Sequence, residues 1–332
     1  MPQPFEAVLL IAFGGPQHRD HIRPFLENVL RGRRVAPARI EEVAHHYELF
    51  DGVSPLTELT IKQADGLRRA IEERGTPLPV YVGMRNWDPY LTDTLARMSR
   101  DGVRHAVGVI AAAHRSYSGC LQYRENVRDA RRALRIDGLR DVAITYVNDW
   151  HRSRGFVAAN AANVIAALDM LPADVRWQSE LVFSAHSIPV TMAERYPYQR
   201  QLEESCTAVA AEIARRLAVT DTPHWRLVYQ SRSGRPEDPW LGPDISDYLR
   251  AAPSNGISAV VVCPIGFVAD HIEVLYDLDV EAAAVAREAG IPFARASAVN
   301  GQPLFIEALA DAVTDCIRTY THGPPLTLVP ST

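Results

Sequence analysis

Three carboxylates repeat at four-residue intervals within the segment 262–281, as Glu273, Asp277 and Glu281. Four residues of an α-helix turn only about 40° beyond a full turn, so these side chains stay near one face. The row would be about 12 Å long. An inserted π-type turn, which is common at functional sites, would align it further. Because like charges at this spacing repel, we expect a cationic or protonatable partner for the row.

A histidine stands at the end of another apolar strand, where His186 follows the run 181–183 and precedes Pro189. A neutral imidazole there can ligate a divalent metal or accept a proton near neutral pH. His186 and Glu273 form a nitrogen and oxygen pair that suits ferrous-type ions, whereas a closed zinc site has four ligands. Taken alone, the histidine also fits a turn and the acids fit a solvated helix surface. The apolar strand before the acids favours the functional interpretation.

Donor and aromatic side chains also recur in the first half of the chain. A basic cluster occupies 31–34, and we expect the stretches 45–48 and 51–56 to form a polar and aromatic loop. Such groups around an apolar cleft suit a flat ligand that carries carboxylates, although each has an ordinary structural explanation. Further candidates on strand-end loops are Arg85, His114, Arg115, Tyr117, Ser118, Gln122 and Tyr123.

Composition narrows the class of protein. The 332 residues are 47% hydrophobic and carry a net charge of −5, which argues against a nucleic-acid partner. The four cysteines form no CxxC pair, which fits a reducing cytosol and gives no zinc or iron–sulfur signature. Residues 7–13 resemble a first strand rather than a signal peptide, and no run is long enough to span a membrane. We therefore expect a cytoplasmic protein.

The sequence lacks the common phosphate-loop, dinucleotide, nucleophile-elbow and HExxH motifs, which argues against nucleotide chemistry.

Short apolar strands alternate with helical patterns along the whole chain. Strands are expected near 6–13, 79–84, 105–112, 141–147, 180–185, 225–231, 257–263 and 292–297. Helices are expected at 58–73, 121–134, 155–168, 200–217 and 303–320. This alternation predicts an α/β fold with parallel sheets covered by helices on both faces. Eight strands in two groups of four, with a joint near 149–155, predict two halves whose strand ends meet at a cleft.

These boundaries divide the chain into two predicted domains and a tail. The first domain is residues 1–150, the second is 151–320, and the tail is 321–332. The helix expected at 303–320 fits packing on either half, including the first.

Six stretches together resemble the ferrochelatase family, particularly bacterial enzymes of the coproporphyrin type. They span nearly the whole chain in the order that the family has. The resemblance implies two Rossmann-like halves with a porphyrin cleft between them, and insertion of Fe²⁺ into the macrocycle. It leaves coproporphyrin III and protoporphyrin IX open as substrates. The stretches are Ala12-Phe13-Gly14-Gly15-Pro16, Gly52-Val53-Ser54-Pro55-Leu56, Gly83-Met84-Arg85-Asn86-Trp87-Asp88-Pro89, Ser184-Ala185-His186-Ser187-Ile188-Pro189, Gln230-Ser231-Arg232-Ser233-Gly234 and 262–281.

The resemblance also implies roles for individual residues. His186 and Glu273 match the family's pair that handles metal and protons, and Asp277 and Glu281 match an acidic row proposed to relay them. Two departures are that His46 replaces an arginine of some members, and that Phe13 replaces a tyrosine able to ligate iron. Phe13 matches a position below the ring. Residues that match positions near the propionates or the edges of the macrocycle are Arg31, His46, Tyr47, Ser54 and Tyr123.

Cofactor and partner expectations follow from the same resemblance. Iron enters as a substrate. Actinobacterial relatives often bind a [2Fe-2S] cluster through C-terminal cysteines, but residues 321–332 contain no cysteine, so we expect no cluster. The expected partners are a porphyrin and ferrous iron, and neighbouring enzymes of haem synthesis are candidates for transient contacts.

Two alternative functions stay open from sequence. A cobalt chelatase acting on a sirohydrochlorin-type ring would use two cleft histidines, for which His114 is a candidate. A non-catalytic carrier of haem or porphyrin would have little need of the acidic row.

Overall fold

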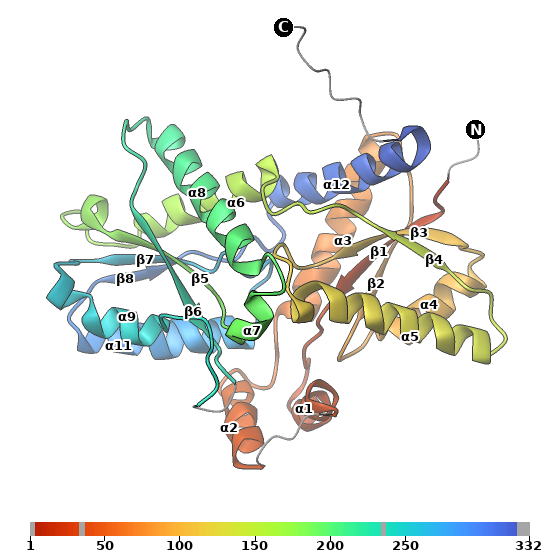
Figure 1. Ribbon diagram of the computed structural model, residues 1–332, viewed down its shortest axis with the longest axis horizontal. Helices are drawn as coiled ribbons and strands as arrows, with labels where there is room; N and C mark the ends of the chain where they lie inside the picture. Colours follow the sequence, from red (N-terminus) through yellow and green to blue (C-terminus); the bar gives the residue numbers. More distant parts are fainter. Residues whose placement is uncertain (1–3, 33–36, 234–236, 324–332) are drawn as a thin grey trace, which may run out of the picture.

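The described part of the chain contains two four-stranded parallel sheets. The computed structural model describes residues 4–32, 37–233 and 237–323. The first sheet has the order β2-β1-β3-β4, with β1 (Ala7–Ala12), β2 (Val80–Met84), β3 (His105–Ile110) and β4 (Ala143–Tyr146). The second has the order β6-β5-β7-β8, with β5 (Glu180–His186), β6 (Trp225–Gln230), β7 (Val260–Cys263) and β8 (Phe293–Arg295). The two halves lie side by side along the longest axis (Figure 1). The predicted α/β fold with two parallel sheets is confirmed.

Helices flank both sheets (Figure 1). The first half contains α1 (Ile22–Leu30), α2 (Pro37–Glu48), α3 (Leu56–Glu73), α4 (Leu91–Arg100) and α5 (Gln122–Ile136). The second contains α6 (Arg154–Leu168), α7 (Val190–Ala193), α8 (Tyr198–Leu217), α9 (Ile245–Ala251), α10 (Ile272–Val274), α11 (Ala283–Glu288) and α12 (Pro303–His322). Two π-helical segments, Tyr117–Leu121 and Leu275–Ala282, precede α5 and join α10 to α11. Among the described residues, no helix has the length and apolar character needed to cross a membrane.

The central strands are apolar on both faces because helices cover both. Every residue of β1 and of β7 is buried, as expected where βαβ crossovers place helices on each side of a parallel sheet. One apolar cluster includes residues of both sheets, such as Leu10 of β1 and Phe183 of β5. The two halves therefore share a core.

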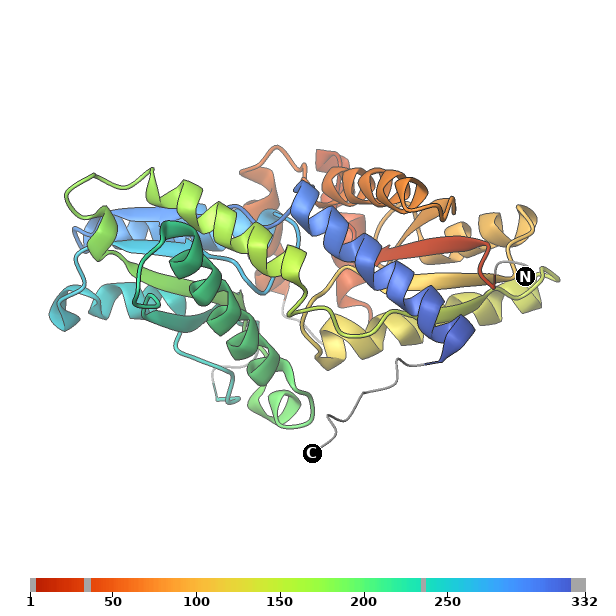
Figure 2. The same cartoon turned by 90° about the horizontal axis from the view of Figure 1, so that it is seen from above.

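The last helix, α12, packs on both halves, a choice that the sequence left open. It contacts α3 of the first half and α6 of the second, and Figure 2 shows it running across the joint. Two glycines permit the close approach. A Cβ at Gly155 of α6 would overlap the carbonyl oxygen of Leu304, and one at Gly66 of α3 would lie 3.1 Å from Ile306.

One sequence expectation was wrong. Residues 45–48, expected in a loop, are the last turn of α2. The segment from 38 to 51 contains no glycine or proline, and Ala44 and Tyr47 are buried at helical spacing against Phe25. This apolar stripe holds the segment as a helix.

Candidate active site

The three carboxylates of the row lie on one continuous helix built from α10, the π-helical segment and α11. Glu273 is in α10, and Asp277 and Glu281 are in the π-helical segment. The π-type geometry that would align the acids further is therefore present. Val274 and Leu278, between the acids, are fully buried in the core of the second half. Burial of this apolar face leaves the acids on the opposite side of the helix.

His186 and Glu273 approach each other at the carboxyl end of β5. The distance from His186 Nε2 to Glu273 Oε2 is 4.0 Å, and the two side chains are 34% and 47% exposed. This is too long for a hydrogen bond. It is short enough for both atoms to reach one dication at bond lengths of about 2.0–2.2 Å. The predicted pair is therefore brought together.

The tautomer of His186 is set by its other ring nitrogen. Nδ1 lies 2.5 Å from the carbonyl oxygen of Ser187, which can only accept a hydrogen bond. In the neutral ring Nδ1 therefore carries the proton, and Nε2 presents its lone pair on the side of Glu273. The Tyr198 hydroxyl donates to the carbonyl oxygen of His186 at 3.0 Å and fixes the backbone there. His186 is thus prepared to accept a proton or a metal ion at Nε2.

Asp277 is held by the end of the neighbouring strand. The Ser231 hydroxyl donates to Asp277 Oδ2, and the Gln230 side-chain amide donates to the same oxygen at 3.3 Å. Gln230 pairs with His186 in the sheet register, so β6 links the row to the histidine. Burial raises the pKa of Asp277 to about 7, and the negative charge of Glu273 adds to this increase, whereas the Ser231 hydrogen bond opposes it.

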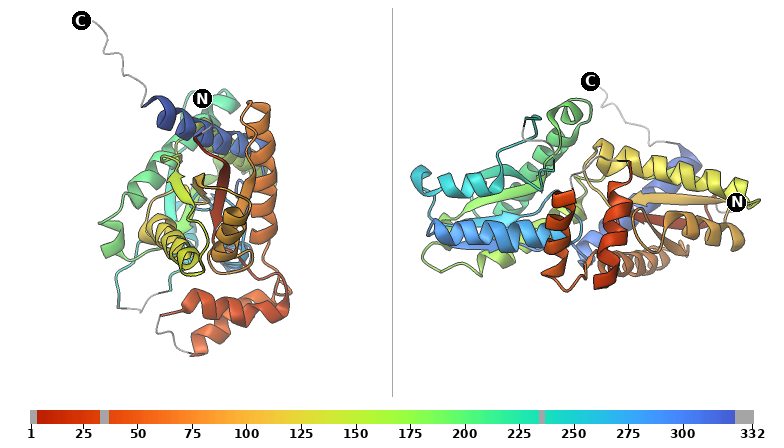
Figure 3. Two further views of the ribbon diagram at one scale, coloured as in Figure 1. Left: turned by 90° about the vertical axis from the view of Figure 1, so that its right-hand side faces the viewer. Right: turned by 90° about the horizontal axis from the view of Figure 1, so that it is seen from below.

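The outer end of the row meets the first half of the chain. Burial, followed by the nearby Asp244, raises the pKa of Glu281, and the neighbouring Tyr276 opposes this increase. The ring of Tyr276 stacks on His46 of α2, with centroids 3.5 Å apart and an interplanar angle of 12°. Figure 3 shows α2 beside this helix. His46 is therefore brought to the row, and burial lowers its pKa.

Three of the predicted porphyrin-binding residues gather around Arg85. The Arg85 guanidinium carbon lies 5.9 Å from the ring centre of Phe13 and 5.8 Å from that of Tyr123. Tyr123 is 6% exposed, and burial raises its pKa to about 12. Arg31 is exposed, donates to Asn28 Oδ1 at 2.5 Å, and lines the same cavity as Arg85.

The cavity beside Arg31 and Arg85 is polar and has a volume of about 470 Å³. Three of the residues that line it each have one buried side-chain atom without a hydrogen-bond partner within the described structure: Asn86 Nδ2, Gln122 Oε1 and Asn126 Oδ1. Buried polar groups are normally paired, so these three atoms are exceptions in the described structure. The cavity is lined by residues of the first half, and the predicted cleft between the halves stays a prediction.

Tyr47 and Ser54 are more enclosed than the sequence suggested. Tyr47 is 7% exposed and packs in a cluster that includes Ile272 of the acidic helix. Ser54 is 4% exposed and lies against Gly15, where a Cβ would come within 2.7 Å of the Ser54 Cβ. Tyr47 therefore adjoins the acidic helix, whereas Ser54 lies at the turn after β1.

His114 does not serve as a second open histidine. It is 3% exposed, and its Nε2 lies 2.9 Å from the Ser205 hydroxyl. Because that hydroxyl donates to the carbonyl oxygen of His151 at 2.9 Å, His114 Nε2 is the donor in their contact. Burial, with the neighbouring His151, lowers the pKa of His114 to about 3. Its position removes the argument for a chelatase site with two cleft histidines.

Sequence reasoning missed several residues of the site. Gln230 and Ser231 were noted only as a motif, although their place at a strand end was a signal for a role. Asn86 and Tyr276 likewise lay within matching stretches without an assigned role, and Asn126 gave no signal, because their neighbours come from distant segments.

Comparisons of fold place the chain among chelatase-like structures. SirB from Bacillus subtilis with Fe³⁺ superposes with a TM-score of 0.53 at 12% identity, over 95% of this chain and 96% of that one. The sirohydrochlorin chelatase SirB of Bacillus subtilis subspecies spizizenii, in complex with cobalt, gives 0.51 at 11% identity, over 94% and 95%. At this identity the likeness concerns the fold alone.

Comparisons of sequence identify the family. The coproporphyrin III ferrochelatase of Streptomyces coelicolor is 45% identical over 94% of this chain and 85% of its own. The ferrochelatase of Rhodopirellula baltica is 41% identical over 97% of this chain and 89% of its own. The family model for ferrochelatase matches residues 5–316. This chain belongs to the ferrochelatase family, whose members insert Fe²⁺ into a porphyrin in haem biosynthesis.

Proposed function

We propose that this chain inserts Fe²⁺ into coproporphyrin III, with His186 and Glu273 as the catalytic pair. The observation that carries the proposal is the 4.0 Å approach of His186 Nε2 to Glu273 at the head of a π-helical acidic row. The relatives named coproporphyrin III ferrochelatase, at 43–45% identity, support the choice of porphyrin.

Metal insertion releases two protons from the pyrrole nitrogens and strips water from the incoming Fe²⁺. His186 Nε2 carries a lone pair and accepts a pyrrole proton, and Glu273 beside it balances the charge on the resulting imidazolium. Because Nε2 has a single lone pair, it acts as a ligand that replaces water on Fe²⁺, beside Glu273, before it takes up the proton. The net reaction exchanges two protons on the macrocycle for one metal dication.

The acidic row beside this pair carries protons away from the reacting atoms or Fe²⁺ toward them. Asp277 lies between Glu273 and the outer Glu281 in sequence, and its pKa of about 7 lets it take up and release protons near neutral pH. Glu281 is exposed and connects the row to solvent. We assign Asp277 and Glu281 as the relay.

This relay predicts a pH dependence that Asp277→Asn removes. A carboxyl with a pKa of about 7 is mostly protonated at about pH 6 and mostly ionised at about pH 8, and only the ionised form accepts a proton. The rate of iron insertion should therefore rise over this interval. The Asn variant should lose that rise and be about tenfold slower at the alkaline end.

The matched control for this prediction is Asp247→Asn, which changes an exposed aspartate of α9 paired with Arg250. It should keep the wild-type profile. An Asp277→Asn enzyme with the wild-type rise would show that another group titrates.

The first half is proposed to hold the porphyrin. Arg31, Arg85 and the side-chain amide N–H of Asn86 suit carboxylate groups, which accept hydrogen bonds from guanidinium and amide N–H groups. Coproporphyrin carries propionates where protoporphyrin has vinyl groups, so it makes more such contacts. The porphyrin-binding assignments of Phe13, Arg31, His46, Tyr47, Ser54 and Tyr123 are retained as proposals.

Anaerobic turnover with Fe²⁺ tests the function and the substrate together. We expect kcat/KM to be at least about tenfold higher for coproporphyrin III than for protoporphyrin IX. Arg31→Met should lower the coproporphyrin value by about tenfold, the size of one charge-assisted hydrogen bond, and leave the protoporphyrin value nearly unchanged.

Arg23→Met is the control, because Arg23 lies on α1, the helix that Arg31 directly follows, pairs with Glu41 at 2.7 Å, and does not line the cavity. Preference for protoporphyrin would contradict the proposed substrate. Binding of metallated and free rings without insertion would indicate a carrier, and faster insertion of cobalt into a sirohydrochlorin would indicate the other chelatase.

A cytoplasmic location and transient contacts with neighbouring haem-pathway enzymes are also proposed. All four cysteines are free thiols, as is usual in a reducing compartment. The proposal that no [2Fe-2S] cluster is bound rests on the cysteine-free sequence 321–332, of which residues 324–332 lie outside the described structure.

A further inference from the structure

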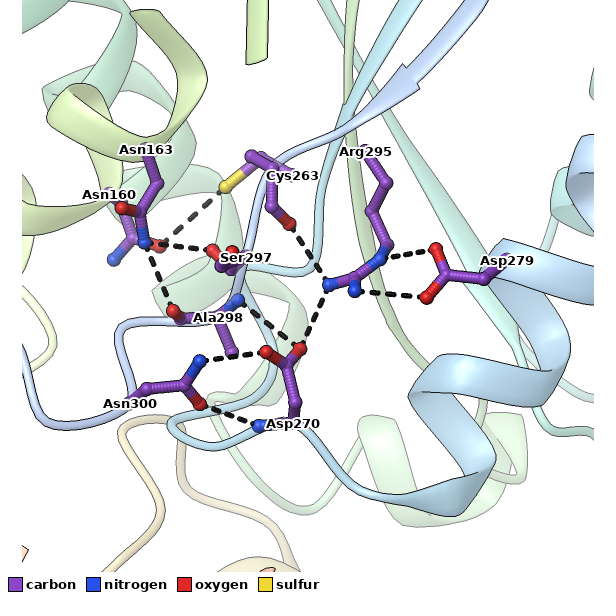
Figure 4. Close-up of polar contacts among 10 residues, drawn as sticks. Asn160, Asn163, Cys263, Asp270, Asp279, Arg295, Ser297, Ala298 and Asn300 are labelled. Carbon is purple, nitrogen blue, oxygen red and sulfur yellow. Dashed lines mark hydrogen bonds and ion pairs between the residues drawn. The ribbon is translucent and has the colours of Figure 1, made fainter. Parts of the chain in front are cut away.

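One arginine outside the acidic row is hydrogen-bonded both to the row's helix and to the loop before it (Figure 4). Arg295, the last residue of β8, donates from Nη1 to Asp270 Oδ1 at 2.9 Å. From Nε and Nη2 it donates to both oxygens of Asp279, at 2.5 and 2.9 Å. Asp270 precedes the helix, and Asp279 lies in its π-helical segment. The arginine therefore restrains both the approach to the helix and its centre.

Asp279 differs from the three acids of the row in that an arginine binds both of its oxygens. Both of its oxygens are occupied by one guanidinium in a fork-like contact, and the Arg295 side chain is only 14% exposed. Such two-bond contacts fix orientation as well as distance. Because Asp279 is two residues from both Asp277 and Glu281, its direction sets the rotation of those residues about the helix axis.

The π-helical segment needs such an outside restraint. π-Helices are rare and occur mostly as single turns within α-helices, whereas this one runs from Leu275 to Ala282. A return to α-helical geometry would rotate Asp277 and Glu281 relative to Glu273. A clamp that holds Asp279 opposes this rotation.

The same network reaches the first half of the chain. Asp270 Oδ2 accepts a hydrogen bond from the Asn300 side chain at 2.7 Å, and its backbone N–H donates to Asn300 Oδ1 at 2.8 Å. Gln63 of α3, which is fully buried, donates from Nε2 to the carbonyl oxygens of Asn300 and Val268, both at 2.9 Å. The loop before the acidic helix is thus bonded to the half proposed to bind porphyrin.

We propose that Arg295, acting through Asp270 and Asp279, is a positioning residue that keeps the acidic row aligned beneath His186. The inference rests on the proposed roles of Glu273, Asp277 and Glu281. Arginine is required because one guanidinium reaches two carboxylates with separate N–H groups, which the point charge of lysine does not reproduce.

Asp279→Ala tests the clamp with least risk to folding, because it leaves the more deeply buried contact of Arg295 with Asp270 intact. We expect kcat for iron insertion to fall about tenfold and KM for Fe²⁺ to rise about tenfold. The porphyrin dissociation constant, measured by fluorescence titration, should stay at the wild-type value. Asp279→Glu, which keeps a carboxylate, should lose less activity than Asp279→Ala. Arg295→Lys, which keeps the charge but not the two-bond contact, should lose about as much activity as Asp279→Ala.

Asp141→Ala is the matched control. Asp141 accepts the same two-bond contact from Arg131, at 2.9 Å for each bond, but in the first half of the chain. It should leave kcat and both substrate constants unchanged. The positioning role is overturned if Asp279→Ala keeps the wild-type kcat and iron KM, or if Asp141→Ala shows the same losses. Failure of the wild-type chain to insert iron would contradict the proposed function instead.

Discussion

Replacing His186 by alanine is expected to lower the rate of iron insertion by at least about a hundredfold, while the porphyrin still binds. The variant loses the nitrogen that faces Glu273 at 4.0 Å, and with it a proton acceptor and a metal ligand. Nδ1 already donates to the Ser187 carbonyl oxygen, so Nε2 is the nitrogen that this ring offers to the substrate. Anaerobic loss of free-porphyrin absorbance measures insertion, and fluorescence titration measures binding.

His224→Ala provides the control for this experiment. His224 is exposed and directly precedes β6. It therefore lies at the amino ends of the parallel strands, whereas His186 lies at their carboxyl ends. Its removal should change neither rate nor binding. Undiminished insertion by His186→Ala with normal porphyrin affinity would remove His186 from the chemistry, even though the chain belongs to the family.

The fold was predictable because its signals are local. β1 and β7 are unbroken apolar runs, and each ends where glycine or proline follows within two residues, at Gly14 and Pro264. The spacing of Glu273, Asp277 and Glu281 likewise indicated one helix face from the sequence alone. Apolar periodicity and turn residues act over a few positions, and a sequence displays them directly.

The parts that escaped prediction depend on contacts between distant segments. The stacking of His46 on Tyr276 joins residues 230 positions apart, and no sequence pattern near either residue predicts the contact. Arg295 is one of 35 basic residues, and its burial between Asp270 and Asp279 follows from how β8 lies beside β7. The two-sided packing of α12 depends on Gly66 and Gly155, whose importance appears only when the helices meet.

A residue type that matches a porphyrin-binding position need not have its side chain exposed to the porphyrin. Tyr47, Ser54 and Tyr123 were predicted to bind the macrocycle, yet all three are nearly buried. Arg85, which covers Tyr123, and the cavity it lines offer polar surface that Tyr123 itself does not. Contact with the porphyrin at this place is therefore expected to come more from Arg85 and its neighbours than from the phenol.

Glu273→Gln is expected to lower iron insertion by about a hundredfold, because the amide keeps the size of the side chain but removes its charge and its basicity. Glu273 heads the row, and its negative charge contributes to the raised pKa of Asp277. The Gln variant should therefore also shift the rising limb of the pH profile, which follows ionisation of Asp277, to lower pH. Glu288→Gln, at the exposed end of α11, changes the same residue type near the end of the same helix and should leave the rate and the profile unchanged.

Combining Glu273→Gln with His186→Ala distinguishes a joint role from two separate ones. If the two groups act on the same proton and the same metal ion, the double variant should be about as slow as the slower single variant. Losses that multiply would mean that the groups act in independent steps. In that case the 4.0 Å approach of His186 to Glu273 would not be the basis of catalysis.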